Sequence, residues 1–573
     1  MIAHAAGGNP LFISEMLEVA RERADVEVPP TLKALLAARL DQLEEPERRV
    51  LGRGSVEGEL FHRGAVQVLV PEEPQVTARL TALVRRELIR PDRAQLEGDD
   101  AFRFRHLLMR DAAYEALPKS LRAELHERFA DWLEGHGGLV ELDEIVGYHL
   151  EQAARYRHEL GLPADDVAER AGERLAAAGR RALWREDRRA AAVLLERALE
   201  LTRPLRLDVL LEVDLAETSF IQDARLAAEL VEGAAERAAA ERYVTGEAFA
   251  RAIGAYHRLN RSECSADELE ALALKALPLL EEAGDHAALV HVWNALGIGV
   301  ASLRGRWADH ARAAEQALKH SRLAGQQRTG LFFLQTALAL GPVPAGEALK
   351  RLDQLLTEAP APFSLFYRAW LLAMLDRFDE ALPLARESNE RQREQDGRLI
   401  GEARLAEIAV IAGDHNAAAT HLRALCDWLE ERDQPGLLST FAPTLGRQLI
   451  ALGRFEEAEA LAARGRELGQ EDDMSTQALW RQVQALVHAH RGEHEQAARL
   501  GREAVAITEQ TDGLNFQGDA LCDLADVLHA AGRKEEAADA LAAALERYTR
   551  KENIPMTRQT RTRLEALRAE ASP

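Results

Sequence analysis

The chain has 573 residues, of which 47% are hydrophobic, 29% are charged and only 5% are aromatic, and this composition is typical of a mostly α-helical protein. It excludes a disordered chain, a collagen and an array of β-sandwiches. The 95 acidic residues outnumber the 72 basic residues, and the net charge of −23 argues against a protein that coats nucleic acid non-specifically.

Residues 1–44 predict a small helical module, or lid. Gly8-Asn9-Pro10-Leu11-Phe12 opens a helix, because Asn9 can serve as N-cap and Pro10 suits the first helical position. Residues 29–31 (Pro-Pro-Thr) stop this region, and residues 32–43 predict a second amphipathic helix.

Residues 45–118 predict a winged-helix domain. Helices are expected at 45–56, 61–70 and 76–88, and the alternation of Phe102, Phe104 and His106 predicts a strand that pairs with the segment after Ile89. Three helices followed by a two-stranded hairpin have the order of a winged helix. An exit helix then begins at 110–116, and residues 119–164 predict linking helices.

Residues 165–573 predict a superhelix of tetratricopeptide-like (TPR-like) repeats. Similar turns begin at four glycines spaced 40, 39 and 40 residues apart: Gly413, Gly453, Gly492 and Gly532. Asp376 takes the same position 37 residues before Gly413, and Gly305 begins a related turn 71 residues before Asp376.

Each repeat predicts two packed helices. An apolar-periodic helix at 520–531 precedes Gly532, which suits the left-handed position that ends a helix, and a second helix follows at 534–548. One pair cannot bury its apolar face alone, so the pairs must stack, and we expect roughly nine or ten of them. For residues 205–300 an irregular helical array is the alternative.

Three segments resemble the bacterial STAND-type, AAA-related signalling ATPases that carry TPR tails. They are Gly8-Asn-Pro-Leu-Phe, residues 29–41 (PPTLKALLAARLD) and residues 102–114 (FRFRHLLMRDAAY). The resemblance implies a lid, a winged helix and a TPR sensor that follow an NTPase core. Such proteins are often fused to adenylate/guanylate cyclase domains or to LuxR-type DNA-binding domains.

The NTPase core itself is not found in the sequence. Lysine occurs only seven times and never follows a glycine, so the P-loop signature GxxxxGK[ST] is absent. No cyclase domain and no LuxR-type helix-turn-helix are visible at the ends. We therefore predict a chain without catalytic residues, which is not an enzyme and which could bind ATP or ADP only with an NTPase core supplied in trans.

Three residues are candidates for nucleotide sensing through the resemblance alone. In the family, the proline of a Gly-x-Pro motif lies against adenine, and Gly8 and Pro10 match that motif. In related proteins a winged-helix histidine contacts the ADP β-phosphate, and His106 matches it, although Arg105 and Leu107 depart from the motif. The alternatives are a helix-starting proline and a histidine that completes the wing.

Other candidate chemistry is sparse. Cys264, Cys426 and Cys522 are isolated and predict small buried residues in a reducing cytoplasm. His488, His490 and His494 cluster at a turn, where solvated histidines are expected rather than metal ligands. No signal peptide and no 18-residue apolar span is present.

Three functions remain open. The first is a cytoplasmic signalling regulator or scaffold whose superhelix binds a protein, peptide or small effector, and whose lid and winged helix dock on an NTPase or cyclase domain in trans. The second is a truncated STAND ATPase linked to a cyclase or a transcriptional regulator. The third is a winged-helix DNA-binding regulator, which the acidic wing tip at 96–100 (LEGDD) makes the minority hypothesis although residues 79–110 hold eight arginines and five acids.

Overall fold

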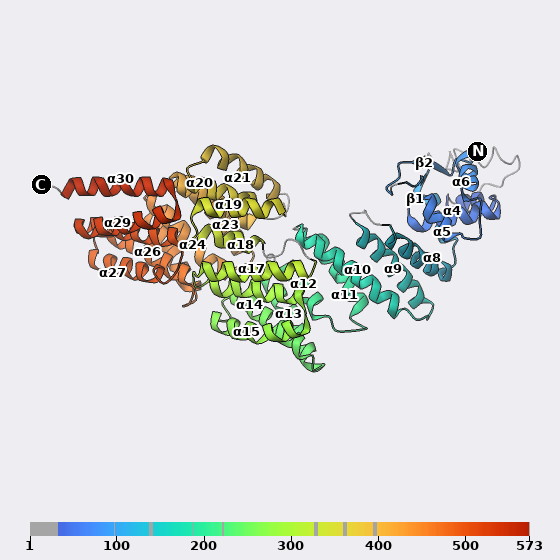
Figure 1. The fold of residues 1–573 in the computed structure, drawn as a ribbon, viewed down its shortest axis with the longest axis horizontal. Coiled ribbons are helices and arrows are strands. Elements are labelled where there is room, and N and C mark those ends of the chain that lie inside the picture. The colour runs from blue at the N-terminus through green and yellow to red at the C-terminus, as the bar shows by residue number, and fades with distance from the viewer. Residues whose placement is uncertain are drawn as a thin grey trace. The chain divides into compact units, whose positions relative to one another are not determined.

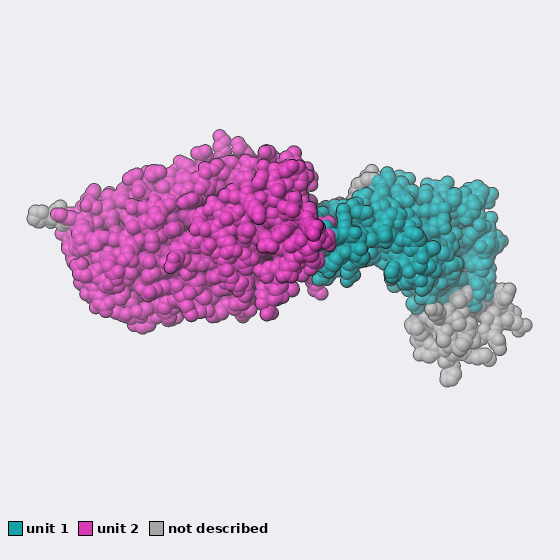
Figure 2. Space-filling model, turned by 90° about the horizontal axis from the view of Figure 1, so that it is seen from below, with its two compact units in different colours: residues 1–182, 190–207 teal, residues 183–189, 208–573 magenta. Residues whose placement is uncertain are grey.

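The computed structural model describes residues 32–96, 98–136, 141–185, 187–220, 223–325, 331–358, 364–393 and 398–571. Contacts divide the chain into two compact units (Figure 2). Unit 1 comprises residues 1–182 and 190–207, and unit 2 comprises residues 183–189 and 208–573. Each unit is described by itself.

Unit 1 begins with short helices and a small sheet and continues with longer helices (Figure 1). Its elements are α3 (Leu32–Asp41), α4 (Glu45–Glu57), β1 (Leu60–His62), α5 (Arg63–Leu69), α6 (Val76–Arg85), β2 (Ile89–Asp92), β3 (Ala101–Phe104), α7 (Leu107–Glu115), α8 (Lys119–Glu134), α9 (Leu142–Glu159) and most of α10 (Asp165–Trp184) and α11 (Arg188–Thr202).

The sheet has the order β1-β3-β2 with antiparallel neighbours. Phe61 lies opposite Phe102, and Phe61 and Phe104 are buried in the core formed with α4, α6 and α7. The prediction of one helix over 61–70 is wrong at its start, because Phe61 and His62 form β1 and the helix begins at Arg63. A three-residue strand is too short for alternation to reveal it, and its pairing partner lies 41 residues further along the chain.

Unit 2 is entirely helical over the residues that the structure describes (Figure 1). Its elements are α12 (Val209–Ser219), α13 (Ala224–Ala240), α14 (Val244–Asn260), α15 (Ala266–Ala283), α16 (His286–Ala295), the π-helical η1 (Leu296–Ser302), α17 (Trp307–Leu323), α18 (Leu331–Leu340), α19 (Ala345–Glu358), α20 (Ser364–Met374), α21 (Phe378–Arg393), α22 (Arg398–Ala412), α23 (His415–Glu431), α24 (Pro435–Ala451), α25 (Phe455–Leu468), α26 (Met474–His490), α27 (His494–Thr508), α28 (Leu514–Ala530), α29 (Lys534–Lys551) and α30 (Ile554–Ala571).

These helices form an α-solenoid of TPR-like pairs, as predicted. The described part of unit 2 contains nine pairs, from α12/α13 to α28/α29, and α30 follows the last one. Gly532 has φ 76° and accompanies a backbone bond from Arg533 N–H to the Leu528 carbonyl (2.9 Å), which confirms the left-handed helix end. Asp376 adopts the same conformation with φ 61°.

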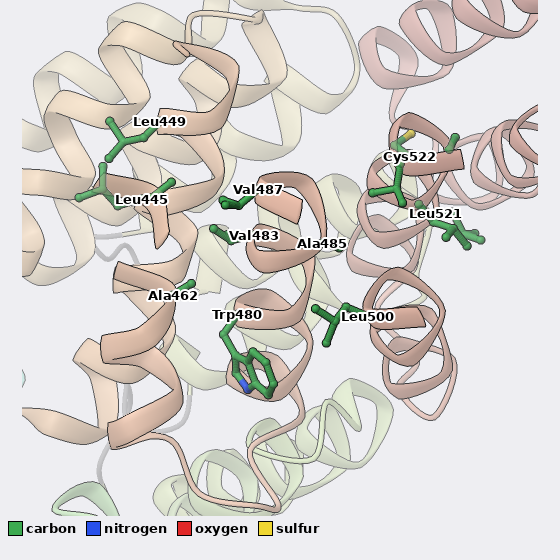
Figure 3. Packing of buried hydrophobic residues seen from close by; sticks show 14 of the residues in the cluster. Leu445, Leu449, Ala462, Trp480, Val483, Ala485, Val487, Leu500, Leu521 and Cys522 are labelled. Atoms are coloured by element: carbon green, nitrogen blue, oxygen red, sulfur yellow. The ribbon is translucent and has the colours of Figure 1, made fainter. Parts of the chain in front are cut away.

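The core between neighbouring repeats is apolar. In the C-terminal repeats it is built from small and branched side chains such as Leu449, Val483 and Ala497, each fully buried. Figure 3 shows Val483 and Val487 of α26 between the helix that carries Leu449 and the helix that carries Leu521. Cys522 lies in this core, and all three cysteines are buried, as predicted.

The first helix of each pair forms the inner layer of the solenoid. First helices of successive pairs contact one another, as α24 does α26 and as α26 does α28, while contacts between the second helices are weak or absent among the described residues. The layer whose helices approach most closely is the concave one.

The solenoid closes on itself after five pairs. Helix α14 contacts α24, and α30 contacts both α20 and α22, so equivalent helices five pairs apart lie side by side. We call the contact between these successive turns the seam. In Figure 2 the visible face of unit 2 is continuous, with no open groove between the turns.

The seam is polar and centres on Lys551. Its buried ammonium donates hydrogen bonds to the carbonyls of Leu338 (3.1 Å), Gly341 (2.7 Å) and Val343 (2.8 Å), which lie at and just after the C-terminus of α18. Burial lowers the pKa of Lys551 to about 7. The next residue, Glu552, accepts the N–H of Gly346 at 2.8 Å.

Asp512 forms a second seam contact. Its carboxylate accepts the N–H groups of Trp307 (2.7 Å) and Ala308 (2.9 Å), the first two residues of α17. The local residue before α17, Arg306, provides no side-chain cap. The cap of this helix therefore comes from about 200 residues further along the chain.

Candidate functional site

The nucleotide-sensing residues predicted from the resemblance are only partly within the structure. Gly8 and Pro10 lie outside the described residues. His106 is described: it is half-buried, has an extended backbone (φ −138°, ψ 134°) and immediately precedes α7, which it does not cap with its ring. The next two residues, Leu107 and Leu108, are 55% and 43% exposed. His106 thus sits at the end of β3 beside an exposed apolar pair.

Behind His106, a buried network joins three helices of unit 1. The Tyr114 hydroxyl of α7 lies 2.6 Å from Nε2 of His126 on α8, and Nδ1 of His126 lies 2.7 Å from Nδ1 of His149 on α9. Burial lowers the pKa of His126 to about 3 and that of His149 well below its ordinary value. Both rings are therefore neutral near pH 7, and the network fixes the packing of α7 against α8 and α9.

The arginines of residues 79–110 are largely engaged in ion pairs. Five of the eight pair with carboxylates: Arg79 with Glu44 (3.4 Å), Arg86 with Glu47 (3.4 Å), Arg103 with Asp92, Arg105 with Glu87 (3.8 Å) and Arg110 with Asp111 (3.0 Å). Their charge is balanced locally, so this face offers little unpaired positive potential to phosphates.

The histidines near residue 490 do not gather as metal ligands. His488 pairs with Glu493, and His490 stacks on Phe455 with ring centroids 3.7 Å apart. Among the described residues no group of three His, Cys, Asp or Glu side chains could hold a metal ion. Nor does any described helix have the length and apolar character needed to cross a bilayer.

The strongest concentration of unusual side chains lies on the inner layer of unit 2. We call it the inner cluster: Arg404 and Glu407 of α22, Arg447 of α24, and Asp519 and Asp523 of α28. Three consecutive pairs separate α22 from α28, yet the charges of Glu407, Arg447 and Asp519 influence one another. The tight curvature of the inner layer brings them together.

Arg447 is the centre of the cluster and is satisfied by two aspartates. Its guanidinium binds Asp523 bidentately, with Nε to Oδ2 at 2.7 Å and Nη2 to Oδ1 at 3.0 Å, and Nη1 lies 3.3 Å from Asp519. Burial disfavours the charge of Arg447, but Asp519 and Asp523 raise its pKa well above the ordinary value. Tyr548 donates its hydroxyl to Asp519 at 2.6 Å.

Arg404 is held by aromatic faces alone. Its guanidinium carbon lies 4.5 Å from the ring centre of Trp370 and 5.4 Å from that of Tyr367, a cation–π arrangement. Its Nε and Nη1 atoms are buried and have no hydrogen-bond partner among the described residues. Such donors cost free energy until an acceptor reaches them.

Glu407 is the complementary unpaired group. It lies three residues after Arg404 on α22, is partly open to solvent, and forms no hydrogen bond or ion pair with any residue that the structure describes. Burial raises its pKa, Arg404 opposes this shift, and Asp519 adds to it. The inner layer thus holds one unsatisfied donor and one unsatisfied acceptor a helical turn apart.

Sequence reasoning missed the inner cluster. The only local signal was the occurrence of charged residues within apolar-periodic helices, for example Asp519 and Asp523, which are four residues apart on one face of α28. Their partner Arg447 lies more than 70 residues away in the sequence. No spacing pattern in a single sequence links residues at that separation.

The sequence matches no protein-family model and no curated protein. Among solved structures the chain is similar to a STAND protein with a tetratricopeptide repeat sensor, PH0952 from Pyrococcus horikoshii, with 14% identity over 96% of this chain and 68% of that chain and a TM-score of 0.34. It is also similar to yeast Tom70 (12% identity, 79% of this chain, 97% of that chain, TM-score 0.30) and to human IFIT1 in its dimer with m7Gppp-AAAA (13%, 79%, 96%, TM-score 0.38). The assignment of an α-solenoid rests on the helix packing described above.

Proposed function

We propose that the chain is a non-enzymatic, cytoplasmic signal-transduction regulator that binds a protein or peptide partner on the inner layer of unit 2. The observation that carries this proposal is the pair Arg404 and Glu407, whose polar atoms are unsatisfied in an enclosed concave layer. A bound partner would supply the missing acceptor and donor. Stacked helical repeats offer an extended concave surface for such a partner.

A selection of peptides followed by hydrogen exchange tests the proposal. Random peptides displayed on phage would be selected on the full chain, and the exchange of backbone amides would be compared with and without each selected peptide. Protection is expected in the inner helices α22, α24 and α28. Protection confined to the outer helices α23, α25 and α27 would overturn the inner-layer site.

We further propose that residues 45–118 are a winged-helix domain, with residues 1–44 as lid, residues 119–164 as linking helices and residues 165–573 as the TPR superhelix. The order α4-β1-α5-α6-β2-β3 supports this assignment, since it places three helices around a three-stranded sheet that ends in a hairpin. In this proposal, partner binding in unit 2 shifts the equilibrium of a switch module in unit 1.

An NTPase or cyclase domain supplied in trans is the proposed partner of unit 1, and a truncated STAND ATPase remains the alternative. The exposed Leu107 and Leu108 beside His106 support docking of another domain there. Calorimetry with ADP and ATP, on the chain alone and with a candidate core, tests the role of Gly8, Pro10 and His106. Nucleotide binding that survives His106→Ala unchanged would remove the sensor role. DNA binding is disfavoured by the ion pairs of the arginines between residues 79 and 110.

A further inference from the structure

We infer that the inner cluster recognises a basic side chain, lysine or arginine, within an extended segment of the partner. Arg404 would take a main-chain carbonyl of that segment, and Glu407 together with Asp519 would take the cation. This inference rests on the proposed function and adds the chemistry of the partner. Its three steps are the balance of charge, the placement of the unpaired groups and the exclusion of other ligands.

The inner cluster carries one negative charge more than it carries positive charges. Arg447 and Asp523 neutralise each other through their bidentate pair. This leaves Asp519 and Glu407 against the single charge of Arg404. Asp519 is only partly compensated, since it lies 3.3 Å from one Arg447 nitrogen and keeps 26% of its side chain exposed. A monovalent cation completes the balance in a recess where water screens charges weakly.

Glu407 faces this deficit directly. The carboxylate of Asp519 disfavours its ionisation, and Arg404 is not within ion-pair distance of it. A lysine or arginine placed between Glu407 and Asp519 would satisfy both carboxylates. Charge-assisted hydrogen bonds of this kind are about twice as strong as neutral ones.

Arg404 fixes where the partner's main chain must run. The Trp370 and Tyr367 rings hold the guanidinium in place, and both aromatic side chains are 2% exposed. A peptide carbonyl can accept from the guanidinium without adding charge. An extended segment places a carbonyl and the side chain of an adjacent residue a few ångströms apart, which suits groups one helical turn apart on α22.

Other ligand classes fit less well. An acidic segment would satisfy Arg404 but would face three carboxylates, two of them without a full counter-charge. An apolar segment would leave both unpaired groups unsatisfied, at a cost for each. A nucleic acid would meet the negative cluster as well as a chain whose net charge is −23.

Calorimetry with short peptides on the full chain tests this inference. The probes are the blocked peptides Ala-Ala-Lys-Ala-Ala and its variants with arginine, norleucine or glutamate at the centre. We expect the lysine and arginine peptides to bind at least about tenfold more tightly than the norleucine peptide, and the glutamate peptide to bind least. Equal affinity for lysine and norleucine peptides would overturn the inference.

Matched variants locate the preference. Glu407→Gln should abolish the preference for the basic peptides, while Glu430→Gln, which removes the same charge from the exposed face of the outer helix α23, should leave it intact. Arg404→Met should weaken all four peptides alike, because it removes the main-chain contact. Unchanged discrimination in Glu407→Gln, with the helical circular dichroism preserved, would also overturn the inference.

The two proposals fail in different ways. If selected peptides protect α22 and α28 but carry no excess of lysine or arginine, the inner-layer site stands and the recognition of a basic side chain falls. If basic peptides bind but protect only outer helices, the site itself is wrong.

Discussion

Two kinds of contact hold unit 2 together, and they differ in chemistry. Neighbouring repeats meet through apolar cores in which side chains such as Leu449 and Val483 are fully buried (Figure 3). Successive turns meet at the seam through polar groups, chiefly Lys551 and Asp512, which bind backbone atoms about 200 residues away. The core is redundant and spread over many residues, whereas the seam depends on a few.

This difference shows how a repeat sequence can encode a closed superhelix. The apolar pattern recurs every 40 residues or so, and it fixes each pair against the next. It does not fix the pitch that brings α30 beside α20. Single polar side chains at the seam select that pitch, because they satisfy helix ends that would otherwise be left unpaired.

The largest effect is expected from a cavity in the core. Leu449→Ala removes a fully buried side chain and should lower the free energy of unfolding by about 2–5 kcal/mol. Hydrogen exchange would show the loss as faster opening of α24, α25 and α26, with the seam little affected. As a control, Leu274→Ala, at a position 57% exposed, should change the free energy by less than about 0.5 kcal/mol.

The next effect is expected from the seam. Lys551→Met keeps an unbranched side chain but leaves three carbonyls without their donor, and we expect a loss of about 2–3 kcal/mol at pH 6. The exchange of amides around Gly341 and Gly346 should accelerate, while α24 and α26 keep their protection. If the loss spread evenly over all repeats, the distinction between core and seam would be invalid.

A titratable group within the core sharpens the contrast. His310 is 1% exposed, has both ring nitrogens without a partner among the described residues, and burial lowers its pKa to about 4. Below pH 6.5 the unfolded chain takes up a proton that the folded chain refuses, so stability falls as the pH drops towards 4. At pH 5 the loss should be about 2 kcal/mol relative to neutral pH.

His310→Phe is the matched variant for this titration. It should remove the part of the acid sensitivity that arises between pH 6.5 and 4, as measured by the midpoint of denaturant unfolding at each pH. Parallel curves for the wild type and the variant would mean that the buried ring is not neutral. Lys551 offers the contrast within the seam, because there a buried charge has three carbonyl partners.

The sequence allowed the local features to be predicted and left the long-range ones open. The turn at Gly532 and the helix that follows it were predicted because a left-handed glycine and a 3.6-residue period are local signals. The start of the 61–70 helix was wrong, because β1 exists only through pairing with β3. The roles of Gly8, Pro10 and His106 remain predictions. The Arg447–Asp523 pair and the Lys551 contacts depend on a curvature that no local period specifies.

The smallest effect separates a cap at the seam from an ordinary cap. Asp512→Ala removes the acceptor for the first two N–H groups of α17, and Asp223→Ala removes the local N-cap of α13, whose carboxylate accepts the Leu226 N–H at 2.9 Å. Each substitution should lower the free energy of helix opening by about 1–2 kcal/mol, because the lost interaction is of the same kind. In Asp223→Ala the faster exchange should stay within α13. In Asp512→Ala it should appear both at the start of α17 and in residues 511–513, since one contact holds the two segments together. Exchange confined to α17 would mean that the turns of the superhelix are held by the remaining seam contacts without the aid of Asp512.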